Sequence, residues 1–206
     1  MAVTTAPAPS EVLAEHTSGP RSFGWWGMVW LIATEASLFA LLIASYFYLR
    51  FRNGIEWPPE HIEAPRLALP LLMSAILWSS SIPVHIAHKA IEHGDQRRLK
   101  AGLAFGFLLG LVFLLLSLGV EWPEILHHEF TPRTNSYGSM FFTITGFHLS
   151  HVVVGLTMNA WVQARAWHGA FDGERHVSVQ IFSMYWHFVD IVWVFVLLSI
   201  YISPHL

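Results

Sequence analysis

Residues 101–120 read AGLAFGFLLGLVFLLLSLGV, a stretch of twenty residues without a charged side chain. At about 1.5 Å per residue, a helix of this length spans about 30 Å, which is the thickness of the hydrocarbon layer of a membrane. An uncharged apolar run of about 18 residues or more is the usual signature of a transmembrane helix. The stretch therefore predicts a helix that crosses a membrane.

Four other apolar runs surround this one, and each is long enough to do the same. The five candidate spans hold 20–26 residues each and cover 25–48, 67–88, 101–120, 138–162 and 177–202. The short segments between them carry most of the charges, glycines and prolines. We therefore predict an all-α integral membrane bundle of five transmembrane helices, with one domain over 23–206 and a flexible N-terminal tail over 1–22.

The composition agrees with a membrane protein and narrows its chemistry. The 206 residues are 54% hydrophobic and 12% charged, which is about half the charged fraction of a soluble domain. A net charge of −3 gives no reason to expect a nucleic-acid partner. Because there is no cysteine, iron–sulfur clusters, thiolate copper centres, covalent c-type haem and disulfides are excluded, and any metal would depend on the thirteen histidines.

The distribution of lysine and arginine predicts the orientation of the bundle. Cytoplasmic loops of membrane proteins carry an excess of these residues. A cytoplasmic N-terminus puts seven of them inside and four outside, namely Arg21, Lys89, Arg97, Arg98, Lys100, Arg165 and Arg175 against Arg50, Arg52, Arg66 and Arg133. We therefore expect the N-terminus in the cytoplasm and the C-terminus outside.

Polar residues recur on one face of several predicted helices, at about 100° per residue. An acidic side chain at mid-membrane costs at least about 2.5 kcal/mol unless it is neutralised or paired, so Glu35 should be protonated or hydrogen-bonded to a facing helix. We therefore expect a shared, buried polar seam between the helices. Its members are Glu35, His85, His148, His151, His187 and Asp190.

The third predicted span has small residues at a regular spacing instead of a polar stripe. Gly102, Gly106 and Gly110 follow one another at intervals of four residues, which places them on one helix face. Such a doubled small-xxx-small pattern lets the backbone of a second helix approach closely. We expect helix packing at these three glycines.

Three interpretations of the polar seam remain open from the residues alone. In the first, the side chains hydrogen-bond to one another and fix the packing of the helices. In the second, His148 and His151 combine with His187 or His85 to bind a metal, or an opposed histidine pair holds a b-type haem. In the third, Glu35 and the histidines form a path for protons.

Three local sequences, each inside a predicted span, carry a family resemblance. They are GMVWLIATEASLF at 27–39, GFHLSHVVVG at 146–155 and YWHFVDIVWVFVLLSIY at 185–201. Together and in this order they resemble the subunit III family of cytochrome c oxidases and related haem-copper oxidases. The number of predicted spans is similar to the short bacterial form with five helices.

The resemblance implies that the chain is subunit III of a proton-pumping terminal oxidase, which passes electrons from cytochrome c to oxygen. In such an enzyme, haem and copper sit in the partner subunits I and II, and subunit III has no catalytic centre of its own. Subunit III packs mainly on subunit I, binds structural phospholipid and supports proton uptake. The resemblance also implies the bacterial cytoplasmic membrane as location, and allows membership in a respiratory supercomplex.

The resemblance further assigns roles to the polar residues. Glu35 corresponds to the buried membrane carboxylate of the family, His148 and His151 to its paired histidines, and His187 and Asp190 to its WHFVD pair. None of them would be a metal ligand. Three other functions stay open: a subunit III-like protein of a quinol oxidase, one of a nitric oxide reductase, and a stand-alone membrane carrier for a metal or protons.

Overall fold

The computed structural model describes residues 22–53, 57–58, 66–127, 131–133 and 135–205, and within them every regular element is helical. Five helical stretches are long and apolar enough to cross a membrane. The predicted all-α bundle of five spans is therefore confirmed. Of the tail predicted over 1–22, all but Ser22 lies outside the described residues.

Three of the helices, α2 (Phe23–Asn53), α3 (Ala68–Glu92) and α6 (Ser136–Trp167), are longer than the apolar runs that predicted them. The others are α4 (Gln96–Leu116), α5 (Trp122–His127) and α7 (Val177–Val196). A π-helical segment, Ser117–Glu121, joins α4 to α5, and another, Leu197–Ile202, extends α7. The added turns contain polar residues, such as Arg50 and Arg52 at the end of α2. A helix can continue past the hydrocarbon layer because its backbone groups stay hydrogen-bonded to one another.

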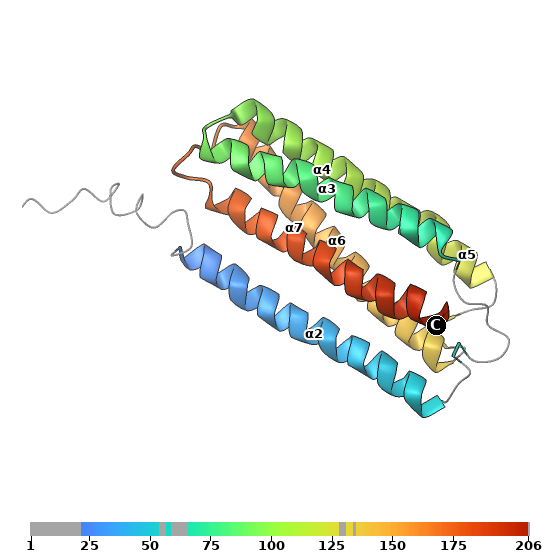
Figure 1. The fold of residues 1–206 in the computed structure, drawn as a ribbon. Coiled ribbons are helices and arrows are strands. Elements are labelled where there is room, and N and C mark those ends of the chain that lie inside the picture. The colour runs from blue at the N-terminus through green and yellow to red at the C-terminus, as the bar shows by residue number, and fades with distance from the viewer. Residues whose placement is uncertain (1–21, 54–56, 59–65, 128–130, 134, 206) are drawn as a thin grey trace, which may run out of the picture.

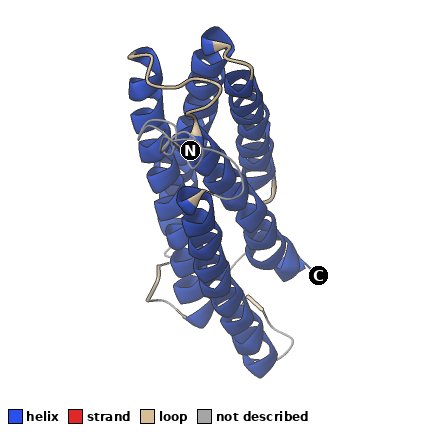
Figure 2. Cartoon of the chain, turned by 90° about the vertical axis from the view of Figure 1, so that its left-hand side faces the viewer, coloured by secondary structure: helices blue, strands red, loops and turns tan. Residues whose placement is uncertain are grey.

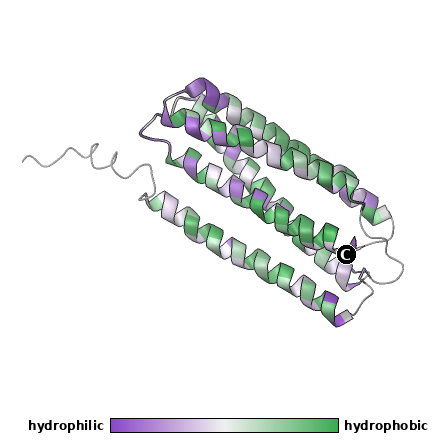
Figure 3. Ribbon diagram, viewed as in Figure 1, coloured by the Kyte–Doolittle hydropathy of each residue, from purple (hydrophilic) through white to green (hydrophobic). Residues whose placement is uncertain are grey.

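Helix α7 lies in the middle of the bundle. It packs against α2, α3 and α6, while α3 and α4 form an antiparallel pair on the side away from α2 (Figures 1 and 2). Within the chain, 61% of the apolar stretch of α7 is buried, against 11% for α2. Apolar residues cover the middle of the helices, and hydrophilic ones gather at the turn between α3 and α4 (Figure 3).

A single tryptophan on α7 contacts three other helices. The Trp186 side chain is fully buried, and its Nε1–H donates to Ser80 Oγ on α3 at 2.9 Å. A methyl group at Gly110 of α4 would lie 2.6 Å from Cη2 of the indole, and one at Gly155 of α6 would lie 2.7 Å from Cζ3. The two glycines therefore leave the space that the ring fills. About two turns further along α7, Trp193 makes a similar contact with α3 by donating to Ser74 Oγ at 2.8 Å.

The three glycines of α4 fall on a contact face, and they meet two kinds of neighbour. A methyl group at Gly102 would lie 2.4 Å from the Pro83 carbonyl oxygen, and one at Gly106 would lie 2.6 Å from a methyl of Val84. At these two positions α4 lies close to α3. Gly110 instead faces the Trp186 ring, so the glycine at this position makes room for a side chain.

A tight turn holds α3 and α4 together at the hydrophilic end. Gly94 has a φ of +73°, which is a conformation that favours glycine, and its N–H donates to the Ile91 carbonyl at 2.9 Å. Asp95 then caps α4 by accepting hydrogen bonds from the backbone N–H groups of Arg97 and Arg98, each at 3.1 Å. This turn fixes how the two helices are aligned and where α3 ends.

We predict that Gly102→Ala destabilises the bundle, because the added methyl group meets backbone and cannot be accommodated by a side-chain rotation. Overpacking of this kind costs about 1–3 kcal/mol, which should lower the midpoint of thermal unfolding in mild detergent. Gly119→Ala is the control, since nothing lies within 4 Å of its added methyl group. Equal unfolding midpoints for the two variants would contradict the close approach of α3 and α4.

Candidate functional site

The acidic residue of the first span pairs with a histidine of the fourth. Glu35 Oε2 on α2 lies 3.0 Å from His151 Nε2 on α6. The other ring nitrogen, Nδ1, lies 2.7 Å from the backbone carbonyl oxygen of Phe147. The His151 ring is stacked on that of Tyr185 of α7, with the ring centroids 6.5 Å apart. The Tyr185 hydroxyl donates to the backbone carbonyl of His151. The pair thus connects three helices at membrane depth.

The hydrogen bonds of this pair determine which of its atoms carry protons. The Phe147 carbonyl can only accept, so Nδ1 of His151 carries a proton. Between Nε2 and Glu35 there is then one proton, which belongs either to a neutral acid or to an imidazolium facing a carboxylate. Both arrangements are neutral overall, which limits the cost of the pair in the membrane. The site can therefore hold one proton and pass it between two atoms 3.0 Å apart.

A second polar group joins α3 to α7. The Ser81 hydroxyl donates a hydrogen bond to Asp190 Oδ2 and lies 3.0 Å from His187 Nδ1. Since a hydroxyl has one hydrogen to give, His187 must donate to the serine from Nδ1. The result is an ordered chain of hydrogen bonds from histidine to serine to aspartate. The Asp190 side chain is buried, and its second oxygen, Oδ1, has no hydrogen-bond partner.

The two remaining members of the predicted seam lie in different surroundings. His148 is completely buried among aromatic rings, and its ring centroid lies 4.8 Å from that of Trp193 and 5.9 Å from that of Phe113. Neither of its ring nitrogens has a hydrogen-bond partner. His85 is exposed on α3, with its ring 6.1 Å from that of His187. The chain by itself does not bury His85, so the place of this residue in a buried seam stays a prediction.

The structure separates the polar residues instead of joining them in one seam. Glu35 and His151 lie between α2 and α6, whereas His187 and Asp190 face α3, and the rings of Trp186 and Trp193 occupy the space around His148 and toward α3. His148 and His151 do not meet His187 or His85 in a set of three ligands; among the described residues, such a group occurs only at His88, Glu92 and His176. The combination that the sequence suggested for a metal is therefore not brought together.

Two groupings were missed by the sequence analysis. Glu121 was assigned to a connecting segment, but it is 4% exposed inside the π-helical stretch and faces the hydroxyl groups of Tyr201 and Ser117. The signal available was an acid directly after an uninterrupted apolar run. The second is the group of His88, Glu92 and His176, whose members come from two helices and have no common motif.

We predict that Glu35→Gln retains the stability of the bundle, because its amide N–H can donate to a neutral His151 and its size is unchanged. Glu35→Ala should lose about 1 kcal/mol, the usual size of an interhelical hydrogen bond in a membrane protein. Thermal unfolding in detergent distinguishes the two variants. Equal losses in both would show that the carboxylate itself is required and that the proton-sharing pair described here is wrong.

The chain is similar to known proteins over most of its length. The family model described as cytochrome c oxidase subunit III matches residues 8–204. The chain is 36% identical over 185 residues to the cytochrome c oxidase subunit 3 of Locusta migratoria, covering 85% of this chain and 67% of that protein. It is 33% identical to the one of Oryctolagus cuniculus and 35% identical to the one of Arabidopsis thaliana, each over 181 residues, 85% of this chain, and 68% and 67% of the relative.

The resemblance seen in the three motifs is confirmed by these matches, which extend over almost the whole chain. Five spans that can cross a membrane agree with a multi-pass membrane protein. The chain belongs to the cytochrome c oxidase subunit III family.

Proposed function

We propose that this protein is the accessory third subunit of an aerobic terminal oxidase that takes electrons from cytochrome c and pumps protons. The family membership supports a haem-copper oxidase subunit III, and the named relatives are subunits of cytochrome c oxidase. Its enzymatic activity is that of the complex. Haem and copper belong to subunits I and II, and this chain contributes packing, lipid binding and proton supply.

The proposal rests on one observation: the chain leaves polar side chains in its membrane-spanning helices partly exposed. The side chain of Glu35 is 31% exposed in the isolated chain, and His85 is exposed as well. Polar groups of this kind rarely face lipid and usually face protein or water. A partner that reaches both α2 and α3 would cover them, and subunit I is the partner that we propose.

The same fold leaves apolar surface for the partner and for lipid tails. Trp30 and Leu41 of α2 are each 70% exposed, and Phe105 of α4 is 62% exposed. Residues of this type suit either the helices of a partner or the acyl chains of a phospholipid. We propose that subunit I takes part of this surface and that structural phospholipid takes part of the rest.

The proposed role in proton uptake rests on the Glu35–His151 pair. The pair holds a proton between two atoms 3.0 Å apart, and its acid is partly exposed toward the proposed partner. A group of this kind can receive a proton from one side and release it on the other without leaving a net charge in the membrane. In this proposal, His148 and Asp190 are structural, because their buried positions connect them with other helices of the same chain.

We propose the bacterial cytoplasmic membrane as location, with the N-terminus in the cytoplasm and the C-terminus outside. The orientation is supported by seven lysines and arginines on the proposed inner side against four on the outer side. The relatives named above come from two animals and a plant, and the bacterial assignment rests on the similarity to the short five-helix form. Contact with other respiratory complexes is compatible with the exposed apolar surface.

Gentle purification tests the proposed function. The chain is tagged, extracted from its native membrane in mild detergent and analysed for co-purifying proteins and for haem absorption. We expect larger subunits carrying haem and copper, and oxygen consumption driven by reduced cytochrome c. A chain that purifies alone, with transport or redox activity of its own, would overturn the proposal. Co-purification with a quinol oxidase or a nitric oxide reductase would replace the electron donor or acceptor that we assign.

A further inference from the structure

Three potential metal ligands meet at the hydrophilic end of the bundle, away from the polar groups discussed above. They are His88 and Glu92 at the end of α3 and His176 at the start of α7, and their ligand atoms all lie within 4.8 Å of one another. From this arrangement we infer that the chain has a binding site for a divalent transition-metal ion of the zinc class. The inference does not depend on the proposed function, which assigns no role to these residues.

The fold brings the three residues together through two independent constraints. His88 and Glu92 are four residues apart on α3, so they lie on one helix face, and His88 Nε2 is 3.8 Å from Glu92 Oε1. His176 occupies the N-cap position of α7, and its ring centroid is 6.3 Å from that of His88. The site thus combines a pair of ligands on α3 with a single ligand at the start of α7.

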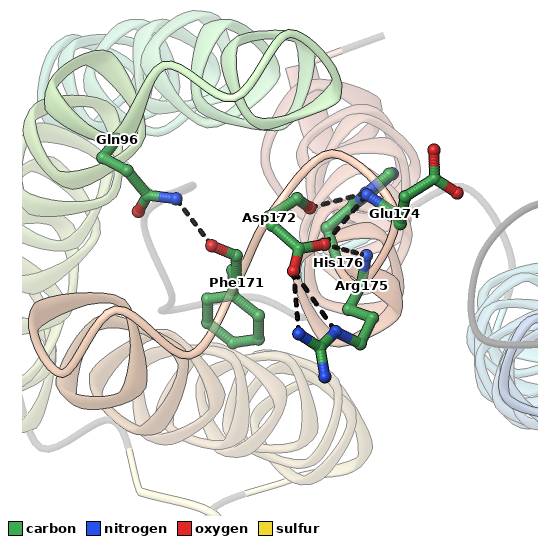
Figure 4. A network of polar contacts seen from close by, with 6 residues as sticks. All are labelled: Gln96, Phe171, Asp172, Glu174, Arg175 and His176. Atoms are coloured by element: carbon green, nitrogen blue, oxygen red, sulfur yellow. Dashed lines mark hydrogen bonds and ion pairs between the residues drawn. The ribbon is translucent and has the colours of Figure 1, made fainter. Parts of the chain in front are cut away.

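The segment before His176 is fixed on several sides (Figure 4). The Asp172 carboxylate accepts hydrogen bonds from the backbone N–H of Glu174 at 3.0 Å and of Arg175 at 2.6 Å, and it also binds the Arg175 guanidinium at 3.1 Å. The Gln96 side chain donates to the Phe171 carbonyl at 2.6 Å, which ties the segment to the start of α4. A ligand on such a segment is held in place before any metal binds.

The hydrogen bonds of the two histidines leave nitrogen atoms for a metal. His176 Nδ1 lies 3.3 Å from the Asp172 carbonyl oxygen, which can only accept, so this nitrogen carries the proton and Nε2 keeps its lone pair. A second partner of this kind is usual for histidines that bind metals. His88 Nε2 is buried without a hydrogen-bond partner, a state that proteins normally avoid and that a metal would relieve.

The third ligand already has a cation beside it. Lys89 Nζ lies 3.0 Å from Glu92 Oε2 and 3.4 Å from Oε1. Since Oε1 is the atom that faces His88, a metal would bind this oxygen while the lysine retains Oε2. The lysine would then orient the carboxylate, although its positive charge lowers the affinity for a metal.

The donor set selects the class of metal. Two imidazole nitrogens and one carboxylate oxygen suit Zn²⁺ and similar ions, whereas Mg²⁺ and Ca²⁺ prefer oxygen ligands alone. In a tetrahedral zinc site, neighbouring ligand atoms are about 3.3 Å apart. Since the three ligand atoms lie within 4.8 Å of one another, no distance between them must shorten by more than about 1.5 Å. Water would occupy the remaining position, and the bound ion would clamp the end of α3 to the start of α7.

Equilibrium binding of radioactive Zn²⁺ tests the site. The chain is purified in detergent with whatever co-purifies, using an affinity tag without histidine, then treated with a chelator and equilibrated with Zn²⁺ in excess Mg²⁺. His176→Gln and Glu92→Gln each remove one ligand. His168→Gln is the matched control, because it removes an exposed histidine from the same connecting segment and leaves the cluster intact.

We expect wild type and His168→Gln to bind one more Zn²⁺ per chain than His176→Gln, and Glu92→Gln to bind this ion at least tenfold more weakly. Zn²⁺ should also raise the unfolding temperature of wild type more than that of Glu92→Gln, whose size is unchanged. Equal stoichiometry and affinity in all four proteins would overturn the inference. Displacement of the Zn²⁺ by Mg²⁺ would overturn the assigned metal class.

Discussion

The fold depends on the insertion of one large ring between two glycines. Trp186 of α7 fills the space that Gly110 and Gly155 leave open on α4 and α6, and its indole N–H binds Ser80 of α3. In a membrane, helices gain little from hydrophobic burial against one another, so close packing and interhelical hydrogen bonds decide their association. Trp186 packs against α4 and α6 and hydrogen-bonds to α3, which fixes the position of α7, and Trp193 makes a similar hydrogen bond to α3.

This aromatic centre determines what the polar residues can do. Because indole rings occupy the space between the helices, the Glu35–His151 pair lies on the α2 side and the His187–Ser81–Asp190 chain lies on the α3 side. Glu35, His151, Ser81 and His187 are partly exposed, whereas Asp190 is buried and its Oδ1 has no hydrogen-bond partner among the described residues. The separation argues against a common metal centre of these residues and in favour of a chain that is completed by a partner, as expected for an accessory subunit.

Sequence reasoning predicted the five spans because apolar length alone specifies a transmembrane helix, as in 101–120. It also predicted that Glu35 needs a partner, since an unpaired acid in lipid is costly. It could not identify His151 as that partner, because periodicity shows which face of a helix a residue lies on and not which helix packs against that face. Gly110 shows the same limit: its spacing predicted a close contact, while the contacting ring comes from 76 positions further along the chain. The meeting of His88 with His176 depends on the alignment of two helix ends, which no local pattern encodes.

A double-mutant cycle between Gly155 and Trp186 tests the role of the aromatic centre most directly. Gly155→Ala places a methyl group 2.7 Å from the indole, so we predict a clear loss of stability in thermal or denaturant unfolding. In a Trp186→Leu background, the same substitution should cost much less, giving a coupling of at least about 1 kcal/mol between the two positions. Losses that simply add would contradict the insertion of the ring between the glycines, and with it the packing around α7.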